Sequence, residues 1–137
     1  MEPKSAGIVV VRRFDDGIKV LCLKKFDGVF DITKGIIDAG ESDIEAALRE
    51  VEEESGIVNL KFEWGLCSKS YGKGKVYLAS TDQDARIGTN PTTGKKEHES
   101  YEWLNFDDAT RVVEKFLVGA LIWAESEIMG DPDVNIY

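Results

Sequence analysis

Three glutamates in the stretch EVEEE, namely Glu50, Glu53 and Glu54, have a spacing that suits metal chemistry. If the stretch is helical, successive residues turn by about 100°, and the three carboxylates fall within an arc of roughly 100°. Neighbouring like charges on a helix repel each other, so the helix gains no stability from this grouping. A hard divalent cation such as Mg²⁺ or Mn²⁺ takes carboxylate oxygens as ligands and would relieve the repulsion. The spacing therefore predicts a metal site, and a solvated acidic face is the alternative.

The predicted helix that would carry these glutamates has clear start and stop signals. Ser42 and Glu45 have the spacing of a capping box, and Gly56 stands where a left-handed residue ends many helices. Four apolar residues fall on one stripe that should face the core, namely Ile44, Ala47, Leu48 and Val51. We therefore expect a helix over residues 42–55 that presents the three glutamates beside its buried stripe.

Residues close to the glutamates suit supporting roles. Arg49 is always charged and can hold a carboxylate through two parallel hydrogen bonds, so we expect it to orient the metal ligands. An ordinary surface pair between Arg49 and Glu45, four residues earlier, is the alternative. Gly35 would let the backbone approach a metal ion or a phosphate closely. Lys34 is a candidate phosphate contact, with a solvated loop lysine as the alternative.

The rest of the chain predicts one α/β domain over residues 1–128, followed by a loosely held tail over residues 129–137. Apolar and alternating runs predict strands at 6–13, 18–23, 29–32, 58–71, 75–80 and 101–106. A polar stretch with two turn signals predicts a long loop over 82–96. Asp107 should open a helix whose apolar spacing continues to Ala124. Strands interspersed with helices indicate a layered α/β fold.

Composition narrows the class of protein. The 137 residues carry a net charge of -9, which disfavours a nucleic-acid binder, because such proteins usually show a basic footprint. No apolar run is long enough to span a bilayer, and the first residues lack a signal-peptide pattern, so we expect a cytoplasmic protein. Cys22 and Cys67 lie in separate apolar segments, and we expect both to be reduced core residues. His98 is the only histidine, so a zinc site built from histidines is disfavoured.

Residues 34–57 resemble the signature of the Nudix hydrolase superfamily, and no position of that signature is missing. The matching residues are Gly35, Glu41, Arg49, Glu50, Val51, Glu53, Glu54, Gly56 and Ile57. The resemblance implies an α/β/α sandwich around a mixed sheet, and hydrolysis of a nucleoside diphosphate linked to another group. It also implies that Glu50, Glu53 and Glu54 bind Mg²⁺ or Mn²⁺, that the Gly35 carbonyl can join them, and that one signature glutamate can assist water deprotonation.

Beyond the signature, the chain resembles the asymmetric diadenosine tetraphosphate hydrolases, which release ATP and AMP. The opening AGIVVVRR and the run Glu97-His98-Glu99, followed by Tyr101, Trp103 and Leu104, carry this likeness. One departure is Thr33, which stands where that family usually has a proline before the lysine and glycine. Other diphosphates stay open as substrates: ADP-ribose, a dinucleotide cofactor, an inositol pyrophosphate or a capped RNA end. A catalytically silent nucleotide sensor is disfavoured because every signature acid is present.

Residues outside the signature are candidates for the remaining roles. Glu97 aligns with the region of the resembling family just named, and we expect it to be a second source of the general base, with Glu99 behind it. A solvated loop acid is the alternative for both. Lys95 could bind distal phosphates or be solvated. An adenine ring would stack on an aromatic side chain, for which Tyr77, Tyr71 and Phe116 are the candidates.

Overall fold

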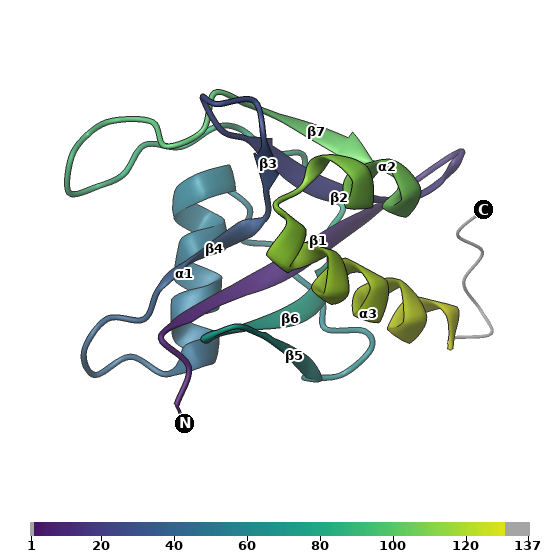
Figure 1. Cartoon of the computed structure of the whole chain (residues 1–137), viewed down its shortest axis with the longest axis horizontal. Coiled ribbons are helices and arrows are strands. Elements are labelled where there is room, and N and C mark those ends of the chain that lie inside the picture. The colour runs from purple at the N-terminus through teal and green to yellow at the C-terminus, as the bar shows by residue number, and fades with distance from the viewer. Residues whose placement is uncertain (1, 131–137) are drawn as a thin grey trace.

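The computed structural model describes residues 2–130, and its centre is a mixed sheet with helices on both faces (Figure 1). The strands are β1 (Ser5–Phe14), β2 (Gly17–Lys24), β3 (Phe30–Asp31), β4 (Thr33–Ile36), β5 (Ser68–Tyr71), β6 (Gly74–Ser80) and β7 (Ser100–Leu104). The helices are α1 (Asp43–Ser55), α2 (Phe106–Val112), a short 3-10 turn η1 (Lys115–Leu117) and α3 (Val118–Met129).

Strand β1 organises the sheet because it pairs with three other strands. The strands lie in the order β3-β2-β1-β6-β5, with β4 also paired to β1 and β7 also paired to β2. The β1–β6 pair is parallel and runs from Ser5 opposite Gly74 to Val11 opposite Ser80, whereas the remaining strand pairs are antiparallel. The first half of β1 holds β4, so the loop that precedes α1 is fixed to the centre of the sheet.

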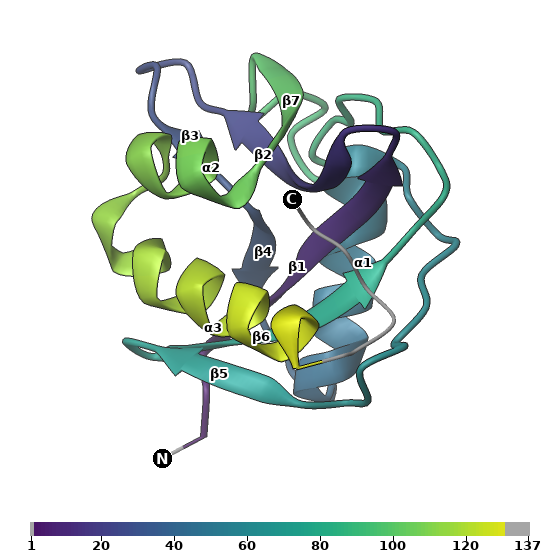
Figure 2. The ribbon, with the colours of Figure 1, turned by 90° about the vertical axis from the view of Figure 1, so that its right-hand side faces the viewer.

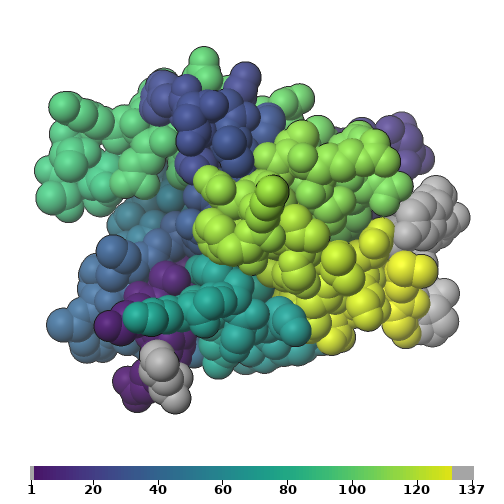
Figure 3. Space-filling model, in the orientation of Figure 1, coloured from purple at the N-terminus to yellow at the C-terminus, as the bar shows by residue number. Residues whose placement is uncertain are grey.

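Alternation along β1 divides the interior into two cores. Ile8 and Val10 point toward α1 and pack with its buried face, whereas Val9 and Val11 join the core under α2 and α3. Figure 2 shows α1 on one side of the sheet and α2 and α3 on the other. In Figure 3 the yellow-green atoms of η1 and α3 cover the second face. The predicted α/β/α sandwich around a mixed sheet is confirmed.

The predicted strand over residues 58–71 is wrong for most of its length. Only Ser68–Tyr71 forms a strand, and Lys61 contributes an isolated bridge to Ser80. Gly65 has a φ of 86°, in the left-handed region, and this turns the chain before β5. Leu66, which seemed part of an apolar pattern, is exposed.

The long helix predicted from Asp107 to Ala124 is also wrong, because the chain breaks in the middle. The cap is Asn105, whose side chain accepts from the Asp108 N–H at 2.8 Å, two residues before the expected start. Val113 is extended, and the Glu114 N–H donates to the Phe30 carbonyl at 3.1 Å. This hydrogen bond replaces a helical one and ties the break to β3.

Other expectations concern the cysteines and the ends of the chain. Cys22 is buried as predicted, and burial raises the pKa of its thiol to about 12, whereas Cys67 is only half-buried.

Helix α3 runs to Met129, one residue past the predicted end of the domain, and most of the predicted tail (131–137) lies outside the described residues. Among residues 2–130, no helix is both long and apolar enough to cross a membrane.

Candidate active site

Helix α1 presents the signature glutamates, and both of its ends are capped as the sequence predicts. The Ser42 hydroxyl accepts from the Glu45 N–H at 3.2 Å, and the Glu45 carboxylate accepts from the Ser42 N–H at 3.0 Å. At the other end Gly56 is left-handed, and its N–H donates to the Glu52 carbonyl at 2.8 Å. These contacts satisfy backbone groups that a helix end leaves unpaired, so the helix is a fixed support for its carboxylates.

The long loop between β6 and β7 packs against the last turn of α1. The Arg86 N–H donates to the Ser55 carbonyl at 3.0 Å, and the Gly88 N–H donates to the Glu54 carbonyl at 3.2 Å. A Cβ on Gly88 would overlap the Glu53 carbonyl oxygen, so this close approach requires glycine. The loop is therefore joined to the helix that carries the glutamates, and it extends beyond that helix in Figure 1.

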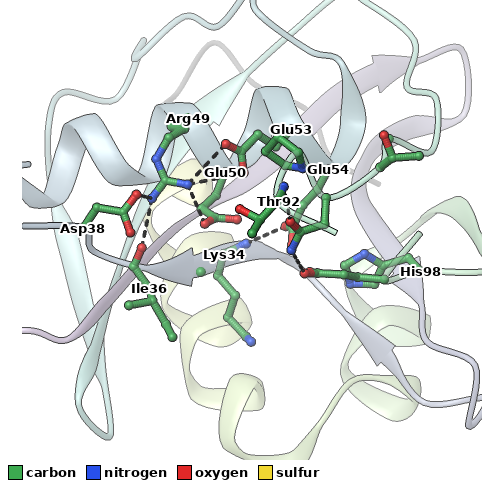
Figure 4. Close-up of a pocket in the computed structure, with 15 residues that line it drawn as sticks. Lys34, Ile36, Asp38, Arg49, Glu50, Glu53, Glu54, Thr92 and His98 are labelled. Atoms are coloured by element: carbon green, nitrogen blue, oxygen red, sulfur yellow. Dashed lines mark hydrogen bonds and ion pairs between the residues drawn. The ribbon is translucent and has the colours of Figure 1, made fainter. Parts of the chain in front are cut away.

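Helix α1, strand β4 and this loop enclose a pocket of about 460 Å³. Its lining combines the signature segment with the loop before β7, and Figure 4 shows these residues facing one another across the pocket. The lining residues are Lys34, Gly35, Ile36, Asp38, Arg49, Glu50, Glu53, Glu54, Gly88, Thr89, Asn90, Pro91, Thr92, Glu97 and His98. All three predicted ligand glutamates, together with Gly35 and the candidate base Glu97, thus line one cavity.

Glu54 is the most deeply buried of the three glutamates, with only 9% of its surface exposed. Its carboxylate accepts from the Lys34 N–H at 3.0 Å. Burial, reinforced by the nearby charge of Glu50, raises the pKa of Glu54 to about 9. Burial also raises the pKa of Glu50, although Arg49 offsets part of that effect. These raised pKa values show that the pocket's own residues do not fully compensate the negative charges of the ionised carboxylates.

Arg49 binds carboxylates in the loop before α1 and two on α1 itself, and Figure 4 shows its contacts on the pocket side with Asp38, Ile36, Glu50 and Glu53. Its Nε and Nη2 donate to the two oxygens of Glu41 at 2.7 and 2.9 Å, and its Nη2 also donates to the Ile36 carbonyl at 2.9 Å. Its Nη1 donates to Glu50 at 2.9 Å and lies 3.3 Å from Glu53. The hydrogen bonds from Arg49 to the Glu41 carboxylate lower the pKa of Glu41 to about 2.

The alternative in which Arg49 merely pairs with Glu45 does not match this arrangement. The Glu45 carboxylate serves the capping box instead. Arg49 contacts two of the three predicted metal ligands, which is the placement expected of a residue that orients them.

The donor set fits a hard divalent cation in its chemistry. Three carboxylates share one pocket, and the Glu50 carboxylate lies so close to Gly35 that a Cβ there would overlap it. Among residues 2–130, no three acidic, histidine or cysteine side chains already surround a common metal position. Glu50 and Glu53 are held by Arg49 instead, and the surplus negative charge of the pocket is what a cation would neutralise.

Three predicted substrate contacts lie in different surroundings. Tyr77 is buried against α1, its hydroxyl donates to Asp43 at 2.8 Å, and this place gives its ring no access to the pocket. Lys95 is exposed on the loop and is not part of the lining. The Lys34 ammonium lies 3.3 Å from Asp31, and in Figure 4 its side chain extends away from Arg49.

Two buried polar residues, His98 in the pocket lining and Asp31 beside it, were not predicted as site residues from the sequence. Asp31 and His98 are 8% and 5% exposed, and His98 Nε2 lies 3.8 Å from the Asp31 carboxylate. Burial alone would raise the pKa of Asp31, but the nearby His98 side chain and the charge of Lys34 lower it overall. The two residues lie close together because β2 pairs with both β3 and β7, and no local sequence pattern predicts a contact of this kind.

Comparisons with known proteins agree with this geometry. The family model described as NUDIX domain matches residues 1–120. The rat bis(5'-nucleosyl)-tetraphosphatase (asymmetrical) is 28% identical, over 83% of this chain and 86% of its own length. The corresponding Caenorhabditis elegans enzyme is 26% identical, over 89% and 93%.

Solved structures show the same fold. A C. elegans Ap4A hydrolase binary complex superposes with a TM-score of 0.78 at 24% identity, covering 93% of this chain and all of that one. The NUDIX domain of Shewanella oneidensis NrtR, complexed with ADP ribose, has a TM-score of 0.66 at 18% identity, over 94% of this chain and 89% of that one. The match over residues 1–120 and the complete signature over residues 34–57 lead to one conclusion: the chain belongs to the NUDIX domain family.

Proposed function

We propose that this Nudix hydrolase cleaves dinucleoside polyphosphates asymmetrically, and that it converts diadenosine tetraphosphate into ATP and AMP. The observation that carries the proposal is the pocket, which has a volume of about 460 Å³ and is lined by Glu50, Glu53 and Glu54 together with Glu97. A cavity rich in uncompensated carboxylates suits a metal-bound phosphate chain. The similarity to bis(5'-nucleosyl)-tetraphosphatases over most of the chain supports the substrate class.

Nudix hydrolases generally need a divalent metal ion, and here Mg²⁺ or Mn²⁺ would be held by Glu50, Glu53 and Glu54, joined by the Gly35 carbonyl. When bound, the ion supplies charge neutralisation at the phosphate oxygens and lowers the pKa of a bound water. Arg49 holds Glu50 and Glu53 in a fixed orientation.

Proton transfer from the attacking water is assigned to Glu97. Oε1 of Glu97 accepts from Asn90, which leaves Oε2 to take the proton. Glu54 is less suited to this role before a cation binds, because burial and Glu50 raise its pKa to about 9. Glu53 and Glu54 remain the signature alternatives for the base.

A nucleobase platform lies next to the pocket. Phe116 is 54% exposed, its ring stacks on Tyr71 with centroids 6.0 Å apart, and the Lys34 ammonium lies 5.6 Å from its centroid. Lys34 also lines the pocket, so one residue connects the phosphate region with the aromatic pair. The exposed face of Phe116 offers an adenine ring a stacking surface, and of the three aromatic candidates only Phe116 is largely exposed.

The test is product analysis by chromatography, with Mg²⁺ and Mn²⁺ supplied separately. Dinucleoside polyphosphates, nucleoside triphosphates, ADP-ribose and dinucleotide cofactors are compared at equal concentration. Diadenosine tetraphosphate should be hydrolysed fastest and give ATP plus AMP. Two ADP molecules would contradict asymmetric attack, and faster hydrolysis of ADP-ribose would move the protein to another substrate class.

The metal site is tested in the same assay. Glu53→Gln and Glu54→Gln should each lose most turnover, whereas Glu52→Gln, on the exposed side of α1, should keep it. Turnover of no compound by the intact protein would favour the nucleotide sensor.

A further inference from the structure

The loop between β6 and β7 is anchored at both ends. At its start, the Gln83 side chain donates to the Gly56 carbonyl at 2.9 Å, and Asp84 accepts from the Trp103 indole at 3.0 Å. At its end, the Glu99 N–H donates to the Lys24 carbonyl at 2.7 Å. The segment between these anchors forms one wall of the pocket and carries Glu97.

Asn90 organises that segment. Its Oδ1 accepts from the N–H groups of Thr92 and Thr93, at 2.8 and 3.3 Å. Its backbone N–H donates to the Lys95 carbonyl at 2.8 Å, and its carbonyl accepts from the Gly94 N–H at 2.7 Å. The side-chain oxygen of Asn90 therefore closes a local turn, as asparagine commonly does, and the turn fixes the direction of the remaining amide nitrogen.

That amide nitrogen is bound to the candidate base. Asn90 Nδ2 donates to Glu97 Oε1 at 2.6 Å. The Glu97 side chain is exposed, so without a partner it would sample many rotamers and point toward the pocket only part of the time. A base must lie within hydrogen-bond reach of the proton that it removes. Asn90 is held by its own turn, so its hydrogen bond to Glu97 Oε1 fixes the carboxylate in one orientation and leaves Oε2 available to take the proton.

We propose that Asn90 is a positioning residue, which holds the Glu97 carboxylate toward the pocket and thereby raises the turnover rate without contacting the reacting atoms. The inference rests on the proposed role of Glu97 as the base. It assigns the amide two separable functions, since the oxygen builds the loop and the nitrogen directs the base.

Asn90→Asp separates these functions. The aspartate keeps an oxygen for the Thr92 and Thr93 N–H groups but replaces the donor with an acceptor that faces Glu97. We expect kcat to fall roughly tenfold, a fraction of what a general base contributes, with KM changed less than about threefold. Asn90→Ser gives the same test with a hydroxyl acceptor and guards against poor folding of the first variant. Thr93→Ala, which removes only a side-chain contact to the Lys95 N–H, should keep wild-type kcat.

A double-mutant cycle with Glu97→Ala decides between positioning and a general loop effect. Asn90→Asp should add no further loss in the Glu97→Ala background, because its effect passes through that carboxylate. Losses that multiply would overturn the inference, and so would a wild-type kcat for both Asn90 variants beside an impaired Glu97→Ala. A wild-type kcat for Glu97→Ala would overturn the role of Glu97 itself, which is a different failure from that of Asn90.

Discussion

The Glu50 carboxylate lies against the backbone of Gly35, in the space that any side chain at Gly35 would occupy. A Cβ there would overlap the Glu50 carboxyl carbon and both oxygens. Gly35 belongs to β4, which is paired to β1 with Gly35 opposite Ala6, so neither the strand nor the helix can easily yield. The signature glycine is therefore needed for the position of a carboxylate as well as for any contact of its own carbonyl.

Gly35→Ala should displace Glu50 from the pocket. Because misplacing or losing support for a metal ligand typically costs about 10–100-fold in metal affinity or activity, we expect a loss in that range. Activity measured over a titration of Mg²⁺ and of Mn²⁺ checks it. Gly119→Ala is the matched control, since a Cβ there meets nothing within 4 Å. Full activity of Gly35→Ala with an unchanged metal requirement would show that Glu50 can move without consequence.

Arg49→Lys keeps the positive charge but removes the planar fork that binds Glu41, Glu50 and the Ile36 carbonyl together. We expect activity to fall about 10–100-fold, as for other residues that support ligands, and the metal concentration at half-activity to rise. Arg111→Lys on α2 is the control for an exchange of arginine for lysine. A normal metal titration curve for Arg49→Lys would show that charge alone is sufficient at this position.

Glu54→Gln should stabilise the metal-free protein while abolishing its activity. The pKa of Glu54 is about 9 in the folded chain, against 4.5 for the ordinary side chain. Above pH 4.5 the unfolded chain releases this proton more readily than the folded chain does, so folding stability decreases as pH rises toward 9. Glutamine removes that penalty.

Thermal unfolding with a chelator, from pH 4 to pH 9, measures the effect. At pH 8 the variant should be more stable by at least about 1 kcal/mol, the equivalent of one pKa unit, or roughly 3 °C in Tm. At pH 4 the two proteins should unfold together. Glu52→Gln, at an exposed position of the same helix, should show no such pH-dependent gain, and a gain of equal size there would assign the effect to net charge.

Helix α1 and the position of its carboxylates could be predicted because the residues that start and end the helix are close together in the sequence. The capping residues and the left-handed Gly56 lie within 15 residues of one another, and the structure has the predicted ends. The predicted apolar stripe is only partly right, because Ala47 and Val51 are buried but Leu48 is 40% exposed. The opening hairpin of β1 and β2 was predictable for the same reason. The prediction failed over residues 58–67, where an apolar pattern met no strand partner apart from the bridge at Lys61.

The opposite wall of the pocket depends on contacts between distant segments. Asp31 and His98 meet across β2, and Glu97 is directed by Asn90 from within a loop of polar residues. Each of these residues has an ordinary local context, so the sequence suggested Glu97 only through family resemblance. Tyr77 shows the converse case, because an aromatic residue in a strand has two possible faces, and pairing with β1 turned this one toward α1.

Phe116→Ala tests whether a nucleobase stacks beside the pocket. Loss of one base–aromatic stack should raise KM for diadenosine tetraphosphate roughly tenfold, the equivalent of about 1.4 kcal/mol. It should change kcat little, since Phe116 is not among the residues that line the glutamate pocket. Inorganic tetraphosphate, tested as a competitive inhibitor, should bind both proteins equally, because it has no base.

Phe26→Ala is the matched control, because Phe26 is 65% exposed and belongs to the turn between β2 and β3, outside the pocket lining. Its removal should leave KM unchanged. The comparison therefore separates stacking from a general loss of exposed aromatic surface. Two results would contradict stacking: normal binding of the dinucleotide by Phe116→Ala, or binding of the dinucleotide and of inorganic tetraphosphate weakened to the same extent. Either result would mean that the base is recognised elsewhere and that the contact between Phe116 and Lys34 has a purely structural role.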